Sequence, residues 1–176
     1  MRHRKQYTLT LLALFFIITT GCSLETSGDS MIEHRAQSAV NSEIKGVSSD
    51  ILHIIAVNGE VSEPGPGVGQ CEEGELGTHF LMRHTWSLTA RNSEALAEAM
   101  ERLKAELPKQ GWKILSYGPN DSPARTLTLM ADHPEKKYGI SIEYWRTRAS
   151  DDAPMLLVGV VSACYKVPAG ESVERY

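Results

Sequence analysis

The 176-residue chain has few of the features that define several common protein classes. It has no basic excess, since its formal charge is −4 and its isoelectric point is about 5.9, which argues against a nucleic-acid-binding protein. Three cysteines are too few for a small disulfide-rich fold. With 41% hydrophobic and 23% charged residues, the composition is neither disordered nor fibrous. We therefore expect a globular protein with a single domain.

The chain also lacks motifs that indicate a catalytic reaction. It has no Gly-x-Ser-x-Gly nucleophile elbow and no His-Glu-x-x-His metal motif. Gly65, Gly67 and Gly69 are not followed by Lys-Ser or Lys-Thr, so they do not make a phosphate-binding loop. Asp132 and Glu143 fit solvated strand charges better than an acid–base pair. We therefore expect no catalytic residue, no cofactor and no metal site.

The N-terminus is typical of an exported protein. Arg2, Arg4 and Lys5 precede an apolar run from Leu9 to Ile18. A basic start followed by a short apolar run is the arrangement of a signal peptide. The run is shorter than the ~20 apolar residues that a membrane-spanning helix needs.

Residues 18–22, Ile-Thr-Thr-Gly-Cys, resemble the lipobox of bacterial lipoproteins. The resemblance implies cleavage after Gly21, attachment of diacylglycerol to the sulfur of Cys22, and often acylation of the new amino terminus. Thr19 departs from the aliphatic residue that the class prefers, and an ordinary signal peptide ending near a cysteine is the alternative. Two acyl chains anchor a protein stably. We therefore expect the mature chain to be tethered through Cys22 to the extracytoplasmic face of the cell membrane.

The sequence divides into four parts. Residues 1–21 are the signal peptide, 22–30 the lipidated cysteine and a polar tether, 31–168 a single folded domain, and 169–176 a loose tail. Residues 1–21 hold three basic residues and no acidic one, so the remainder has 15 Lys and Arg against 22 Asp and Glu, a net charge of −7. An anionic bilayer repels an acidic domain, so we expect the tether to hold the domain away from the lipid surface.

Hydrophobic periodicity predicts helices in the domain. Apolar residues recur every three or four positions from Met31 to Ile44, and Gly46 interrupts them. Residues 51–57, ILHIIAV, fit either a helix or a buried strand. A further helix begins at Asn92 or Ser93 and ends before Gly111. Its apolar stripe consists of Leu96, Met100, Leu103 and Leu107.

Alternation of apolar and polar residues predicts strands around this helix. One strand covers 78–90, after an irregular loop at 58–77, and four more follow the helix at 112–117, 125–131, 138–146 and 155–165. The last is apolar almost throughout, which is typical of a central strand buried on both faces. The expected fold class is α+β, an N-terminal helix followed by a strand-helix-four-strand antiparallel sheet. This order resembles cystatin-like rolls in topology alone.

Cys71 and Cys164 are the cysteines of the predicted domain. Thiols outside the cytoplasm are exposed to oxidation, so the pair predicts a disulfide that joins the two ends of the sheet. A redox or metal role is the alternative, and two cysteines without Cys-x-x-Cys spacing support neither well.

The remaining candidates are two histidines and one aromatic residue. His84 falls on the apolar face of strand 78–90, which favours a packed, hydrogen-bonded histidine over a catalytic one. His133 lies at a turn and fits a solvated loop. By alternation, Trp145 points outward beside Arg146, and these two residues form a candidate contact patch.

The region 31–168 also resembles a group of small actinobacterial lipoproteins of uncharacterised function. The shared features are a helix after the lipid cysteine, a loop with one cysteine (Cys71), a helix that ends in Gly-Trp-x-Ile at 111–114, and a closing strand with a late cysteine at 162–165. The resemblance supports localisation and fold, and it brings no catalytic signature.

The sequence thus favours a lipid-anchored binding or interaction module without catalytic activity. Its expected partner is an envelope protein, and no nucleic acid is expected. The alternative is a carrier of an apolar ligand, held between the helices and the sheet. A small cell-envelope hydrolase is a third interpretation, but it needs a polar cluster that the sequence does not display.

The cysteines give a first prediction. The intact mass of the mature protein extracted from membranes should correspond to residues 22–176 with an acylated Cys22. No thiol should react with iodoacetamide. A chain that retains residues 1–21, or one with a reactive thiol, would contradict the assignment.

Overall fold

The structure is a computed structural model that describes residues 32–62, 64–147 and 153–174. Contacts along the chain separate Met1–Met31 from Ile32–Tyr176, and the account below concerns only the second unit. The predicted signal peptide, Cys22 and the tether lie outside the described residues.

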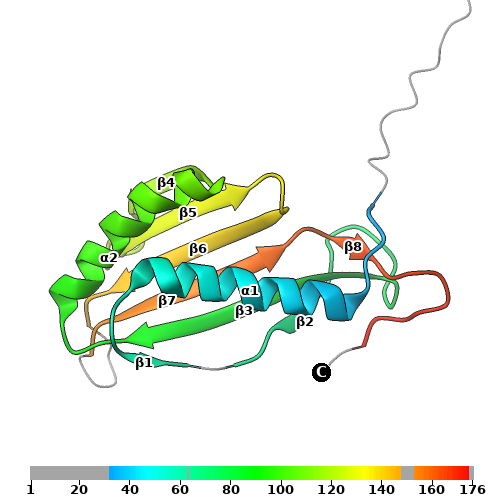
Figure 1. Cartoon of the computed structure of the whole chain (residues 1–176), viewed down its shortest axis with the longest axis horizontal. Coiled ribbons are helices and arrows are strands. Elements are labelled where there is room, and N and C mark those ends of the chain that lie inside the picture. The colour runs from blue at the N-terminus through cyan, green and yellow to red at the C-terminus, as the bar shows by residue number, and fades with distance from the viewer. Residues whose placement is uncertain (1–31, 63, 148–152, 175–176) are drawn as a thin grey trace, which may run out of the picture. The chain divides into compact units, whose positions relative to one another are not determined.

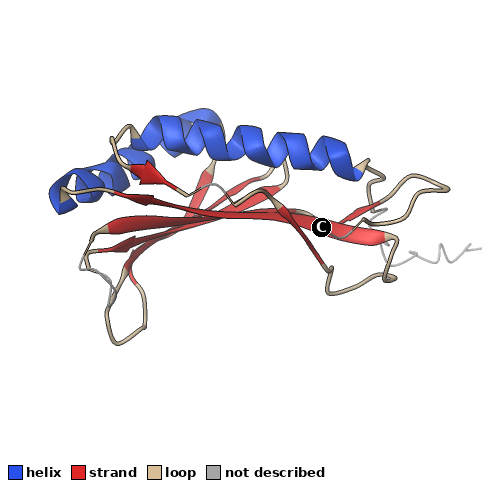
Figure 2. Ribbon diagram, turned by 90° about the horizontal axis from the view of Figure 1, so that it is seen from below, coloured by secondary structure: helices blue, strands red, loops and turns tan. Residues whose placement is uncertain are grey.

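The described chain forms one layer of helices and one layer of sheet, as Figure 2 shows. Helix α1 spans Gln37–Ile55, helix α2 spans Ser93–Glu106, and the 3-10 helix η1 follows at Leu107–Gln110. Both α-helices cover the same face of an antiparallel sheet. The expected α+β class is confirmed, whereas the likeness to cystatin-like rolls stays a prediction. In the part described, neither helix combines the length and hydropathy that crossing a membrane requires.

Eight strands make up the described sheet. They are β1 (Glu60–Val61), β2 (Gly67–Gly69), β3 (His79–Thr89), β4 (Lys113–Pro119), β5 (Leu127–His133), β6 (Tyr138–Trp145), β7 (Met155–Ser162) and β8 (Tyr165–Lys166). Their order is β1-β3-β7-β6-β5-β4, and β2 and β8 also pair with β3. The four strands after α2 are antiparallel neighbours in chain order, as predicted, and β3 lies beside β7 (Figure 1).

Helix α1 is continuous where the sequence predicted an interruption. It begins at Gln37, later than predicted, and runs through Gly46 to Ile55, so residues 51–55 are helical. A buried stripe on both sides of Gly46 explains this continuity. Its members are Val40, Ile44, Val47, Ser48, Ile51, Ile54 and Ile55. Burial of this stripe outweighs the cost of one helical glycine, which is about 1 kcal/mol.

Helix α2 follows the sequence prediction. Asn92 is its N-cap, because its side chain accepts hydrogen bonds from the N–H groups of Glu94 and Ala95. Gly111 ends the following turn with a φ of 87°, which favours glycine. The buried stripe consists of Leu96, Met100, Leu103 and Leu107, as predicted.

The described helices cover only one face of the sheet. In β7, Val158 and Val160 are buried beneath the helices, Leu157 and Gly159 are half-buried, and Val161 is exposed. The central position of β7 is as predicted, but the expectation that both its faces are buried is wrong. An apolar run identifies a strand without revealing how many layers pack on it, and here the described chain supplies one.

The segment 58–77 is more regular than the sequence suggests, since it contains β1 and β2 at the edge of β3. Cys71 follows β2, and Cys164 precedes β8. The two form the predicted disulfide, with their Cα atoms 5.8 Å apart. This bond joins the segment to the last strands of the sheet.

Hydrogen bonds tie both ends of the described chain to the body. The Arg35 N–H donates to the Lys166 carbonyl at 2.9 Å, and the Lys166 N–H donates to the Glu33 carbonyl at 3.0 Å. At the other end, the side chain of Gln37 bonds the backbone N–H and carbonyl of Glu174. The tail, expected to be loose, is therefore held to the body as far as Glu174.

Removal of the disulfide should lower the free energy of unfolding. Cys71→Ala/Cys164→Ala opens a loop with a sequence separation of 93, and loop-closure entropy predicts a loss of up to ~4–5 kcal/mol. Chemical denaturation of the oxidised wild type and the double variant measures the difference. Dithiothreitol should destabilise the wild type and leave the variant unchanged. A loss below about 1 kcal/mol would contradict the role given to this disulfide.

Candidate functional site

Helix α1 places Ser48 against His84 of β3. The Ser48 hydroxyl oxygen and His84 Nδ1 are 2.7 Å apart. Ser42 and Ser49 of the same helix donate to carbonyl groups four residues back, whereas Ser48 makes no such bond to the described chain. Because no described carbonyl accepts the Ser48 hydroxyl proton, we assign this hydroxyl as the donor to Nδ1 and the imidazole proton to Nε2. His84 is thus a hydrogen-bonded histidine on the apolar face, as the sequence predicts.

Burial favours the neutral form of His84. It lowers the pKa of the imidazole below its usual value of 6.5, and the positive charge of Lys45 lowers this pKa further. A neutral ring with Nδ1 occupied offers one hydrogen-bond donor, Nε2–H. No described residue accepts a hydrogen bond from it.

Trp86 lies two residues after His84, on the same face of β3. Its side chain is only 4% exposed, and its indole N–H is buried without a partner in the described part of the chain. An unpaired buried donor costs about 1–3 kcal/mol. An unpaired buried indole N–H needs an explanation, and one explanation is that an acceptor from outside the described chain binds it.

His84 and Trp86 line a hollow of about 370 Å³ between α1, β3 and residues 61, 62 and 64–66. We call it the His84 hollow. Its volume lies within the range of small-ligand sites, roughly 300–1,000 Å³. The other lining residues are Lys45, Ser48, Ser49 and Leu52 of α1, and Val61, Ser62, Pro64, Gly65 and Pro66. The sequence does not single out Ser48, because its hydrogen-bond partner is 36 residues away. Trp86 fits a core or rim aromatic residue in the sequence pattern, and nothing local indicates its unpaired N–H.

A second hollow, of about 930 Å³, lies where β6 ends beside the β4–β5 loop. Trp145 is 38% exposed, and its indole N–H donates to a Glu143 carboxylate oxygen at 2.8 Å. Trp145 therefore points outward, as alternation predicts, and Arg146 lines the same hollow. We call this the Trp145 hollow.

Arg125 is a residue of the Trp145 hollow that the sequence did not single out. Its φ of 49° lies in the left-handed region, which residues other than glycine rarely adopt. Strand pairing of Leu127 with Tyr144 brings Arg125 near Arg146. Neither arginine forms an ion pair within the described chain. Two arginines without an ion-pair partner in the described chain attract anions to one hollow, even in an acidic body.

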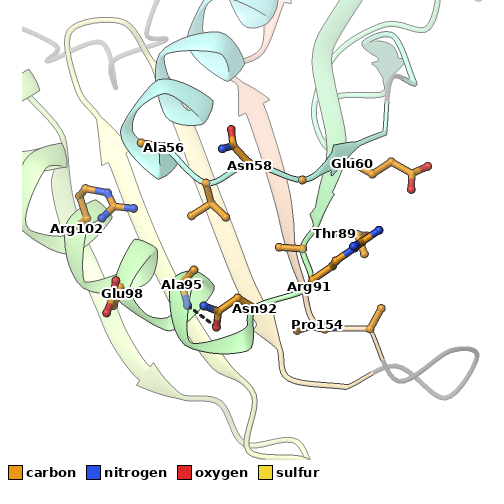
Figure 3. A pocket seen from close by; sticks show the side chains of 14 residues that line it. Ala56, Asn58, Glu60, Thr89, Arg91, Asn92, Ala95, Glu98, Arg102 and Pro154 are labelled. Carbon is orange, nitrogen blue, oxygen red and sulfur yellow. Dashed lines mark hydrogen bonds between the residues drawn. The ribbon is translucent and has the colours of Figure 1, made fainter.

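A third hollow, of about 1010 Å³, opens between the ends of α1 and α2 (Figure 3). The Arg102 guanidinium donates to the carbonyl of Ile54, at 3.0 Å, and to that of Ile55, which ends α1. Asn92, at the start of α2, lines the same hollow and caps that helix. Since both side chains hold helix ends, we assign this hollow a structural role as a junction between the helices.

The structure places His133 in the core, so the expectation of a solvated loop is wrong. His133 is 4% exposed, and its ring lies edge-on to Trp112 with the ring centroids 5.3 Å apart. Its Nδ1 accepts a hydrogen bond from the Lys136 N–H. Gly111 leaves room for the ring, because a Cβ there would lie 3.1 Å from Nε2. Strand β5 extends further than predicted, through His133, and carries the ring inward.

The remaining acidic candidates lie apart. Asp132 is paired with Gly139 and Glu143 with Thr128, so four residue steps, roughly 13 Å, separate the two acidic positions. They do not form an acid–base pair. Within the described ranges, no group of three potential metal-binding side chains comes together.

Comparison of the chain with protein families, curated proteins and solved structures gives no significant match. The function must therefore be argued from the sequence and from the geometry of the described residues.

The lowered pKa of His84 makes stability depend on pH. Unfolding restores a pKa near 6.5, so the unfolded chain binds more protons than the folded chain in mildly acidic solution. The free energy of unfolding should therefore fall as the pH drops below about 6.5. His84→Gln should remove this contribution, and urea unfolding at several pH values from about 7.5 to about 5 measures the difference.

His53→Gln is the matched control, because His53 is exposed on the same helix as Ser48. This variant should keep the pH dependence of the wild type. If His84→Gln kept it as well, the assigned state of His84 would be wrong.

Proposed function

We propose that the protein is a lipid-anchored, extracytoplasmic binding module without catalytic activity, which contacts an envelope protein through the Trp145 hollow. The partner presents an acidic segment with at least one apolar side chain. The observation that carries this proposal is the exposed Trp145 in one hollow with Arg125 and Arg146, which have no ion-pair partner in the described chain.

The side chains of this hollow suit a protein contact. Replacing an interface tryptophan or arginine by alanine often causes the largest losses of binding free energy. A guanidinium forms paired hydrogen bonds with a carboxylate, and Trp145 and Leu127 provide apolar surface in the same hollow. Glu143 holds the indole through its N–H, which reduces the side-chain entropy lost on binding.

The position of the hollow on the body also supports the proposal. Near the start of the described chain, Glu33 accepts a hydrogen bond of 3.0 Å from Lys137, next to the first residue of β6. Trp145 ends that strand of eight residues, roughly 25 Å away. Figure 1 shows the corresponding arrangement, with the start of α1 and β8 at one end of the body and the end of α1 at the other. The Trp145 hollow thus lies far from the start of the described chain.

The membrane anchor is inferred from the sequence. The lipobox-like residues 18–22 and the resemblance to actinobacterial lipoproteins support acylation of Cys22 on the outer face of the cytoplasmic membrane. The net charge of −7 after residue 21 supports a body that anionic lipid headgroups repel.

The surroundings of Ser48 and His84 favour binding over catalysis. A catalytic histidine beside a nucleophilic serine is usually oriented by a third group such as a carboxylate. No described carboxylate forms a hydrogen bond with His84, and His133 is buried against Trp112. A small hydrolase is therefore the less favoured interpretation.

Photo-crosslinking tests the proposed contact. A photoreactive amino acid at Thr147, which lines the Trp145 hollow, should capture one reproducible envelope protein in intact cells. The same probe at Lys109, which is exposed on η1, should not capture it. Trp145→Ala should weaken binding to the captured protein about tenfold or more, since a central interface tryptophan contributes about 2 kcal/mol or more.

Charge reversal tests the chemistry of the partner. Arg125→Glu/Arg146→Glu should abolish capture at Thr147. Arg83→Glu/Lys113→Glu makes the same charge change at exposed residues of β3 and β4, and capture should persist. Equal capture by both probe positions, or equal loss in both double variants, would overturn the proposal.

A further inference from the structure

The His84 hollow differs in charge from the rest of the molecule. None of its described lining residues is acidic, although the chain contains 22 Asp and Glu. Its one basic lining residue in the described chain, Lys45, forms no ion pair with a described carboxylate. Lys45 gives the described walls a positive charge, which attracts an anion.

Two residues of β3 that line the hollow have uncharged hydrogen-bond donors. In the tautomer assigned above, Ser48 occupies Nδ1, and His84 Nε2–H has no acceptor in the described chain. The Trp86 indole N–H is buried and equally unpaired. Residues two apart on one strand face the same side, roughly 7 Å from each other. The two β3 residues that line the hollow thus have hydrogen-bond donors that the described chain leaves without acceptors, and the indole N–H is itself enclosed by protein atoms.

The other walls are apolar or uncharged. Leu52 of α1 and Val61 contribute aliphatic surface, and Trp86 contributes its ring. Aliphatic and aromatic walls gain free energy by removing the apolar part of a ligand from water. The described lining thus combines a cationic residue with a larger apolar surface.

The course of the chain between β1 and β2 creates this space. The Ser62 N–H donates to the Ser87 carbonyl at the edge of β3, and the chain returns to that edge where Gly67 pairs with Arg83. Pro64, Gly65 and Pro66 lie between these two contacts. The two prolines have no backbone N–H to donate to β3, which is consistent with a chain that moves away from the strand edge here. It passes beside residues 84–86 and forms one wall of the hollow.

We propose that the His84 hollow binds a small apolar monocarboxylate. The carboxylate accepts the His84 Nε2–H and pairs with the Lys45 ammonium, while the apolar body lies against Leu52, Val61 and Trp86. A hollow of about 370 Å³ suits a ligand of this kind. The proposal does not depend on the protein contact at Trp145.

Calorimetric titration of the full chain in phospholipid nanodiscs tests the ligand class. The probes are 3-phenylpropionate and its uncharged amide, which have the same apolar body. The acid should bind about tenfold more tightly than the amide, because an ionic hydrogen bond is stronger than a neutral one. Lys45→Met should remove this preference. Lys113→Met, the same change at an exposed lysine of β4, should retain it.

The indole N–H resonances locate the bound acid. The resonance of Trp86, identified by its loss in Trp86→Phe, should shift when 3-phenylpropionate is added, and those of Trp112 and Trp145 should not. No binding, equal affinity for acid and amide, a preference that survives Lys45→Met, or an unmoved Trp86 resonance would overturn the proposal. None of these outcomes affects crosslinking at Thr147, so the two proposals fail separately.

Discussion

The pairing of β3 with β7 organises the described fold. β3 precedes α2 in the chain and β7 is the last long strand, yet they are hydrogen-bonded from Arg83 opposite Val161 to Thr89 opposite Met155. β3 also pairs with β1, β2 and β8. Pairing between segments so distant costs loop-closure entropy. The disulfide that joins the segment after β2 to the segment before β8 offsets part of this cost.

The paired strands β3 and β7 determine the position of helix α1, because its buried stripe packs over both of them. Ser48 is a polar residue in that stripe, and it lies opposite His84 on an otherwise apolar strand face. A polar pair in such an interface is stable when its groups satisfy each other, and the Ser48–His84 hydrogen bond meets this condition. Trp86 has no equivalent partner, and the chain at 64–66 bounds a hollow beside it.

The two candidate sites use different parts of the same framework. The Trp145 hollow forms at strand ends, where a loop and the last residue of β6 meet, and its open surface suits a protein segment. The His84 hollow lies between a helix and a strand edge, and its smaller volume suits a small molecule. Both hollows contain cationic side chains that form no ion pair with a described carboxylate, Lys45 in one and Arg125 with Arg146 in the other. In an acidic protein, such cations concentrate the attraction for anions at a few places.

Local patterns predicted helix α2, its Asn92 cap and the outward Trp145, because each depends on neighbouring residues. They failed at Gly46 and His133, where packing against distant residues outweighs local preference. The sequence by itself determined the α+β class and indicated the disulfide, through periodicity and through cysteine count. Only the tertiary structure decided that Ser48 meets His84 and that Arg125 shares a hollow with Arg146. Strand pairing and helix packing bring those side chains together from distant segments, and no local pattern encodes that proximity.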